Sequence, residues 1–197
     1  MSDGTLFTDL KERKLIRTIV PRGLYPTFVG PHDEWTFTEA IAIDYYLIHL
    51  SSDKEAVRHL LGPEGDFKTR ADILRWESLY NSDFLNEICE VFFPLIGIKP
   101  YNATEFKAAK ENVNTIVSLY EKRLKKQQYL VCDDHETLAD LISAAAFSLG
   151  FISFFDETWR SKHPEVTRWF NRVIKSRFFE GEFESFKMCE TETQPIK

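Results

Sequence analysis

Four consecutive residues carry side chains that bind metal ions in proteins: Cys132, Asp133, Asp134 and His135. A thiolate, an imidazole and carboxylates are typical ligands of zinc. Four adjacent residues cannot all turn toward one ion, however, and no second group of such residues in the sequence completes the set. Because Thr137 follows as a candidate helix N-cap, the segment is predicted to be a turn that leads into a helix. No metal site is predicted.

The other residues whose side chains could take part in catalysis or metal binding are far apart in the sequence. Three cysteines, Cys89, Cys132 and Cys189, are odd in number and form no Cys-x-x-Cys pair, which excludes a zinc ribbon or a dithiol redox centre. Free cysteines are typical of a reducing compartment, so a cytoplasmic location is expected. His49 and His59 lie on or near predicted helical faces, where packing or solvation is commoner than catalysis.

The composition limits the classes of partner. The 197 residues include 25 Lys and Arg against 31 Asp and Glu, which gives a net charge of −6. Nucleic-acid binding favours a basic surface that displaces counterions, so no nucleic-acid partner is expected. The longest uncharged stretch, residues 141–155, is shorter than the ~20 residues that span a bilayer, so no membrane segment is predicted.

The first fifty residues predict a mixed α+β lobe. Residues 5–8 are a strand candidate, and residues 27–29 and 35–37 flank Gly-Pro-His-Asp, a sequence typical of a hairpin turn. From Thr38 to residue 50 the apolar spacing becomes helical. Residues 51–65 are polar and contain two glycines and a proline, so they are predicted to be a linker.

Residues 66–190 predict an all-helical domain. Apolar residues recur on one helical face over 66–93, where Pro94 is expected to end the helix, and again over 104–126. Two further helices follow, and a polar tail over 191–197 is predicted to be frayed.

Short signals mark where these two further helices begin. Thr137 and Asp140 have the spacing of a capping box, in which Asp140 reaches back to the N-cap. Pro164 suits the first position of the last helix. Val166, Trp169 and neighbouring apolar residues are expected to face the core.

Eight strings, in order along nearly the whole chain, resemble the glutathione-transferase-like domain of fungal elongation factor 1-gamma. They are GTLF near the start, PRGL at 21–24, PTFVGP at 26–31, TEAIAIDYYL at 38–47, LRWESLYNSD at 74–83, KPYN at 99–102, ETLADL at 136–141 and HPEVTRWFN at 163–171. The resemblance implies a thioredoxin-like N-terminal lobe over residues 1–50 and the helical transferase domain over 66–190.

The sequence departs from this family in two places. In the family, strand 2 and helix 2 precede the proline-containing strand, whereas here Gly23-Leu24 leads directly into Tyr25-Pro26. A strand and a helix with their loops take about 25–30 residues, so the lobe is expected to be truncated by one βα unit. Two explanations are open: the short lobe is native to this protein, or the sequence comes from a gene form in which this segment was mis-spliced or deleted. The C-terminal elongation-factor domain of the family is also expected to be missing.

The resemblance also implies where glutathione would bind. Aligned by the arginine of PRGL, the hydroxyl or thiol that stabilises the glutathione thiolate falls on Thr18. Tyr25 stands before Pro26, the position whose backbone pairs with the cysteinyl part of glutathione in the family. Glu39 takes the place of the residue that holds the γ-glutamyl ammonium group, while Ala40 lacks the hydroxyl that the family has next to it.

Two classes of function follow from the resemblance. The leading hypothesis is a protein-interaction scaffold in translation elongation, with other subunits of elongation factor 1 as partners and no required cofactor. The resemblance implies contact with the nucleotide-exchange subunit of that complex. A homodimer through residues 66–93 and 104–126 is expected. The alternatives are a glutathione transferase or peroxidase that acts on small electrophiles, or a degenerate paralogue with no activity. The missing βα unit favours a role without catalysis, because glutathione would lose part of its binding site.

Overall fold

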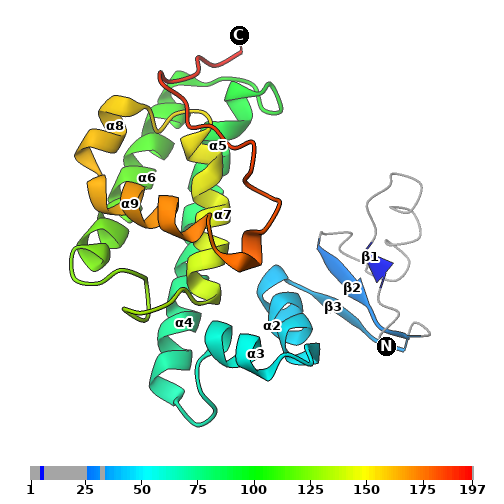
Figure 1. The fold of residues 1–197 in the computed structure, drawn as a ribbon. Coiled ribbons are helices and arrows are strands. Elements are labelled where there is room, and N and C mark those ends of the chain that lie inside the picture. Colours follow the sequence, from blue (N-terminus) through cyan, green and yellow to red (C-terminus); the bar gives the residue numbers. More distant parts are fainter. Residues whose placement is uncertain (1–4, 7–25, 32–33, 197) are drawn as a thin grey trace. The chain divides into compact units, whose positions relative to one another are not determined.

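The computed structural model describes residues 5–6, 26–31 and 34–196 (Figure 1). The chain divides into two compact units, an N-terminal unit over Met1–Val57 and a C-terminal unit over Arg58–Lys197. Each unit has its own secondary structure and its own buried residues. In the described part of the chain, no helix is both long and apolar enough to cross a bilayer.

A small antiparallel sheet forms the described part of the N-terminal unit. Strand β2 (Thr27–Val29) lies between β1 (Thr5–Leu6) and β3 (Thr36–Thr38). Phe28 pairs with Phe37 in the register of β2 and β3. This pairing confirms the predicted hairpin, with β3 beginning one residue later than expected.

Gly30 allows the hairpin turn to close against an aromatic ring. Its backbone N–H donates to the carbonyl of Trp35 at 2.9 Å, and a Cβ at position 30 would lie 2.3 Å from the Trp35 ring. Any side chain there would therefore clash. Helix α2 (Ala40–Leu50) follows, and its Tyr46 ring lies 5.0 Å from that of Trp35 and 5.7 Å from that of Phe28. These rings join the helix to the hairpin.

The predicted linker contains a helix, α3 (Lys54–Leu61). The carboxylate of Asp53 accepts a hydrogen bond from the backbone N–H of Ala56 at 2.9 Å, which caps the first turn. Leu60 and Leu61 are buried at the other end. A polar composition suggested a linker, but one capping residue and two adjacent leucines are sufficient to order two turns.

The C-terminal unit is a bundle of helices (Figure 1). Its elements after α3 are α4 (Phe67–Leu79), a π-helical turn (Tyr80–Phe84), α5 (Leu85–Leu95), α6 (Ala103–Leu124), α7 (Leu138–Phe151), α8 (Glu157–Lys162), α9 (Pro164–Val173) and a 3-10 turn (Arg177–Phe179). The single helix predicted over 66–93 is thus divided by a π turn. Pro94 lies inside the last turn of α5, and the helix ends one residue later, at Leu95. The helix can include this proline because a proline in the last turn removes only one backbone hydrogen bond.

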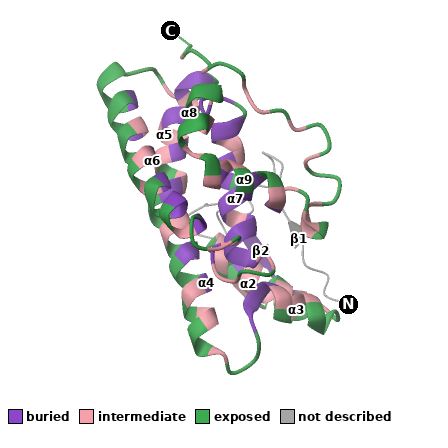
Figure 2. Cartoon of the chain, turned by 60° about the vertical axis from the view of Figure 1, so that its left-hand side comes forward, coloured by how far each residue is buried: buried purple, intermediate pink, exposed green. Residues whose placement is uncertain are grey.

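Helix α7 is the centre of this bundle. Ten of its 14 residues are buried, and they form the purple band that runs along α7 in Figure 2. The Phe147 ring lies 4.5 Å from that of Phe84, 5.1 Å from that of Tyr120 and 5.3 Å from that of Trp169. The core therefore joins the π turn, α6, α7 and α9 through one aromatic cluster.

The capping signal at the start of α7 is confirmed and has a further role. The Asp140 carboxylate accepts hydrogen bonds from the Thr137 backbone N–H at 2.9 Å and from the Thr137 hydroxyl at 3.0 Å. It also accepts from the Leu130 N–H at 2.8 Å and from Nε1 of Trp169 at 2.9 Å. Burial raises the pKa of Asp140, and these four donors oppose that shift.

The expectation of a frayed tail over 191–197 is wrong for residues 193 and 196, and hydrogen bonding to the helices begins just before the tail, at Cys189. The backbone N–H of Cys189 donates to Phe151 at 2.7 Å, that of Thr193 to Ser153 at 2.8 Å and that of Ile196 to Pro94 at 3.1 Å. These carbonyls lie at or just beyond the ends of α5 and α7, where a helix leaves acceptors without partners. The tail therefore supplies backbone N–H donors to carbonyl groups at these helix ends. This role cannot be predicted from the polar composition of the tail.

Candidate functional site

Two of the four residues that the resemblance assigned to glutathione can be placed. Thr18 and Tyr25 lie outside the described residues. Pro26 is exposed and immediately precedes β2, while Glu39 is exposed and immediately follows β3. Thr27 of β2 pairs with Thr38 of β3. Pro26 and Glu39 are next to these two residues in the sequence, so they lie at the same end of the hairpin, opposite the turn. The register thus brings together two residues that are thirteen positions apart in the sequence.

Glu39 has a left-handed backbone conformation, with φ of 70°. A residue other than glycine pays about 1–3 kcal/mol for such a conformation, and strain of this kind is concentrated at ligand sites and tight turns. The Glu39 carbonyl accepts hydrogen bonds from the N–H groups of Ala42 and Ile43, both at 3.1 Å. Its side chain does not cap α2, and the first turn of α2 contains no acidic residue. The first turn of α2 therefore presents backbone N–H groups beside the Glu39 carboxylate, so that groups of opposite charge lie at the helix start.

The three cysteine thiols have no sign of activation. Cys89, Cys132 and Cys189 are free and half-buried. Burial raises the pKa of each thiol, so that all three favour the protonated form at neutral pH. A nucleophilic cysteine needs the opposite shift, toward the thiolate. The described residues therefore place no activated cysteine in the chain.

The Cys-Asp-Asp-His segment lies in the loop between α6 and α7, and three of its four side chains gather. The ligand atoms of Cys132, Asp134 and His135 all lie within 4.8 Å of one another. Asp133 instead accepts a hydrogen bond from the backbone N–H of Gln128 at 2.8 Å. The segment is a turn before α7, as predicted, but the turn also groups a thiol, a carboxylate and an imidazole.

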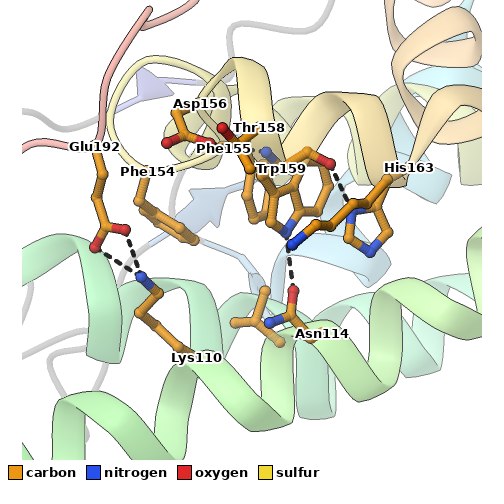
Figure 3. Close-up of a pocket in the computed structure, with 11 residues that line it drawn as sticks. Lys110, Asn114, Phe154, Phe155, Asp156, Thr158, Trp159, His163 and Glu192 are labelled. Atoms are coloured by element: carbon orange, nitrogen blue, oxygen red, sulfur yellow. Dashed lines mark hydrogen bonds and ion pairs between the residues drawn. The ribbon is translucent and has the colours of Figure 1, made fainter.

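A cavity of about 370 Å³ lies between α6, α8 and the C-terminal tail (Figure 3). Trp159 forms one wall, stacked between Phe155 at 3.7 Å and His163 at 4.0 Å. Its Nε1 donates to the side-chain oxygen of Asn114 at 2.9 Å. Sequence reasoning missed this cavity because its lining comes from segments far apart in the chain.

The tail closes one side of this cavity with an ion pair. Nζ of Lys110 lies 2.6 Å from a carboxylate oxygen of Glu192, and each side chain is about one-third exposed. The pair joins α6 to the tail, as the dashed lines in Figure 3 show. Glu192 neutralises the charge of Lys110, and Asn114 accepts the hydrogen bond of Trp159. These lining groups are therefore already paired within the protein, and the arrangement does not indicate a catalytic site.

Comparison with known proteins places this fold. Residues 84–176 match the family described as glutathione S-transferase, C-terminal domain. A Saccharomyces cerevisiae protein described as an elongation factor 1 gamma homologue is 84% identical, with all of both chains covered. That alignment has 225 positions whereas this chain has 197 residues, a difference of 28. At least 28 positions of the relative therefore have no counterpart here.

Longer relatives match over part of their length. Elongation factor 1-gamma 1 of S. cerevisiae is 37% identical over 99% of this chain, which spans 52% of that protein. A glutathione S-transferase of Emericella nidulans is 32% identical over 78% of this chain and 55% of its own length.

A solved structure agrees with these relatives. The crystal structure of the GST-like domain of elongation factor 1-gamma from S. cerevisiae superposes with a TM-score of 0.85 at 35% identity, with all of both chains covered. The α+β architecture with a helical C-terminal unit is thus that of the glutathione transferases. The chain belongs to the elongation factor 1-gamma family and carries its glutathione-transferase-like fold.

Proposed function

We propose that this chain is a protein-interaction scaffold of the translation elongation machinery in the cytoplasm, and that it binds another subunit of elongation factor 1. The observation that carries the proposal is the match, over the whole chain, to a homologue of elongation factor 1-gamma and to the GST-like domain of that factor. The chain spans about half of elongation factor 1-gamma 1, so the partner is inferred for the part that the two proteins share.

The location of the residues assigned to glutathione supports a scaffold over an enzyme. The C-terminal unit has a continuous aromatic core, and its tail is hydrogen-bonded to the helices. The residues assigned to glutathione all fall in the N-terminal unit, and the 28 unmatched alignment positions agree in number with the strand 2 and helix 2 that the sequence lacks there. A partner that binds the helical surface would not need that βα unit.

Exposed apolar side chains offer a surface for association. Phe67 and Leu74 on α4 are 79% and 52% exposed, and they are seven residues apart, so they share one face of the helix. Leu119 on α6 is 49% exposed. Burial of such side chains against a second protein is favourable by the hydrophobic effect. We infer that α4 and α6 form the interface of a homodimer.

A glutathione transferase is the second candidate, and one observation favours it. Pro26 and the strained Glu39 lie at the same end of the hairpin, next to a helix start where backbone N–H groups lie beside a carboxylate. These are features that a binding site for a charged peptide such as glutathione would need.

Glutathione binding and turnover distinguish the two candidates. The purified chain is applied to immobilised glutathione, and its conjugation of chlorodinitrobenzene is measured. A scaffold is expected to show neither retention nor turnover above a buffer blank. Robust turnover that Thr18→Ala abolishes, with the Thr8→Ala variant unaffected, would establish the enzyme instead. A chain that neither turns over glutathione nor binds an elongation factor 1 subunit would be a degenerate paralogue.

A further inference from the structure

The loop before α7 forms one half of a cluster of metal-binding side chains. Cys132, Asp134 and His135 present a sulfur, a carboxylate oxygen and a ring nitrogen that all lie within 4.8 Å of one another. A tetrahedral zinc ion with bonds of 2.0–2.3 Å holds its donor atoms about 3.3–3.8 Å apart. The widest separation therefore needs to shorten by only about 1 Å. Nδ1 of His135 and Oδ1 of Asp134, which are hydrogen-bonded at 2.8 Å, would have to give up this bond or bind the ion through their other donor atoms.

A second segment supplies a further imidazole. His59 of α3 lies in the C-terminal unit, and its ring centroid is 4.4 Å from that of His135. Its Nε2 atom is buried and has no hydrogen-bond partner among the described residues. Nε2 forms an ion pair with the Glu136 carboxylate at 3.6 Å, a contact longer than a hydrogen bond. Nε2 of His59 therefore has an electrostatic partner but no hydrogen bond of normal length, and a bound metal ion could replace that longer contact.

The chemistry of the cluster selects one class of ion. A thiolate with two imidazoles is a soft to borderline donor set that favours zinc over magnesium or calcium, which prefer oxygen ligands. The Asp134 carboxylate completes this donor set, and the carboxylate of Glu136 adds negative charge beside it.

We propose that Cys132, Asp134 and His135 form a zinc site, with His59 as the fourth ligand. The site joins α3 to the loop that leads into α7, two segments of the same unit that are about 70 residues apart in the sequence. It lies wholly in the C-terminal unit and uses none of the residues assigned to glutathione. It is therefore independent of whether the chain acts as a scaffold or as an enzyme.

Cobalt spectroscopy tests the ligands directly, because a thiolate bound to cobalt gives a charge-transfer band in the near ultraviolet. The full chain, stripped with a chelator, is titrated with Co²⁺ and then with Zn²⁺. One cobalt ion per chain is expected, with the thiolate band present and then lost as zinc displaces cobalt. The Cys132→Ser variant is expected to lose the band, and His135→Ala and His59→Ala to bind more than tenfold more weakly.

Matched variants separate ligation from damage to the fold. Cys89→Ser and Cys189→Ser remove the other two thiols and are expected to keep the band and the affinity. Far-ultraviolet circular dichroism of each variant confirms that the helices are retained. Absence of a thiolate band in the unaltered chain, or its persistence in Cys132→Ser, would overturn the site. Unchanged affinity in His59→Ala would overturn the assignment of the fourth ligand.

Discussion

Asp140 joins three segments of the C-terminal unit through a single carboxylate. Its four hydrogen bonds come from the N-cap residue of α7, from the loop at Leu130 and from Trp169 of α9. The carboxylate is fully buried, so each donor would lose its partner without access to water if the side chain were removed. The residue is therefore expected to contribute to stability far more than an ordinary helix cap.

Replacement of Asp140 by alanine is expected to lower the free energy of unfolding by about 3–5 kcal/mol, because buried donors at Leu130 and Trp169 are left unsatisfied. Urea unfolding followed by circular dichroism measures the change. Asp156→Ala is the matched control, since Asp156 caps α8 through one bond to the Trp159 N–H. That variant is expected to lose about 1 kcal/mol. Equal losses in the two variants would contradict the role given to Asp140.

Tyr120 makes stability depend on pH in the alkaline range. The ring is buried in the aromatic core and its hydroxyl lies 3.2 Å from that of Ser143. Burial raises the pKa of Tyr120 above its ordinary value of ~10. The folded state therefore keeps the proton that the unfolded chain loses, so this stabilisation is present below pH ~10 and is lost as the pH rises above it.

Between pH 9 and pH 11 the unaltered chain is expected to lose about 1.4 kcal/mol more stability than the Tyr120→Phe variant, which has no proton to release. Urea unfolding at the two pH values gives the difference. Tyr101→Phe, at a partly exposed position, is the control and should follow the unaltered chain. A parallel pH dependence of Tyr120→Phe and the unaltered chain would show that Tyr120 titrates normally.

Local signals were readable from the sequence, whereas contacts between distant residues were not. The Thr137–Asp140 pair is predictable because a capping box depends on residues three positions apart. The bond from Trp169 to Asp140 and the approach of His59 to His135 depend on how helices pack, and no local pattern encodes them. The candidate zinc cluster therefore became visible only in the folded chain.

At the scale of elements, the C-terminal tail behaves as a part of the bundle. Three backbone N–H groups of residues 189–196 donate to carbonyls at or near the ends of α5 and α7, and Glu192 pairs with Lys110. The polar composition of the tail suggested a frayed end. The tail is held by backbone hydrogen bonds, which do not depend on the identity of the side chains and so cannot be predicted from composition. The same limit applies to α3, whose two turns were predicted as linker.

Removal of residues 189–197 is expected to destabilise the chain by at least about 2–3 kcal/mol, since the three backbone hydrogen bonds that this segment donates each contribute about 1 kcal/mol. The hydrogen bond from Arg160 to the carbonyl of Cys189 is lost with them. Thermal unfolding of the truncated chain measures the loss. Glu192→Gln, which breaks only a partly exposed ion pair, should cost less than about 1 kcal/mol. If truncation leaves the unfolding midpoint unchanged, the tail contributes nothing to the stability of the bundle.

For the whole molecule, the order of elements and the family were predictable because apolar periodicity and short motifs extend along most of the chain. The boundary between the two units, at Val57, lies within residues 51–65, the predicted linker. Its place inside α3 was not predictable, because no break in composition marks it there. The two described glutathione candidates, Pro26 and Glu39, were assigned by resemblance. Their common position at one end of the hairpin required the observed register.

The homodimer proposed through α4 and α6 makes a prediction at this scale. Leu74→Glu places a charge on the exposed apolar face of α4 and is expected to convert the dimer to a monomer, because burying an unpaired charge is unfavourable. Light scattering at several protein concentrations gives the mass. Ile152→Glu, at an exposed site after α7, should remain dimeric. A monomeric unaltered chain would contradict the dimer.

The central claim, that this chain is a scaffold for translation elongation, is tested most directly by calorimetric titration of the full chain with the purified nucleotide-exchange subunit of elongation factor 1. Saturable binding with a fixed stoichiometry and a Kd of about 1 μM or tighter is expected, together with no heat on titration of glutathione. Binding of glutathione without binding of the exchange subunit would contradict the claim and favour the enzyme.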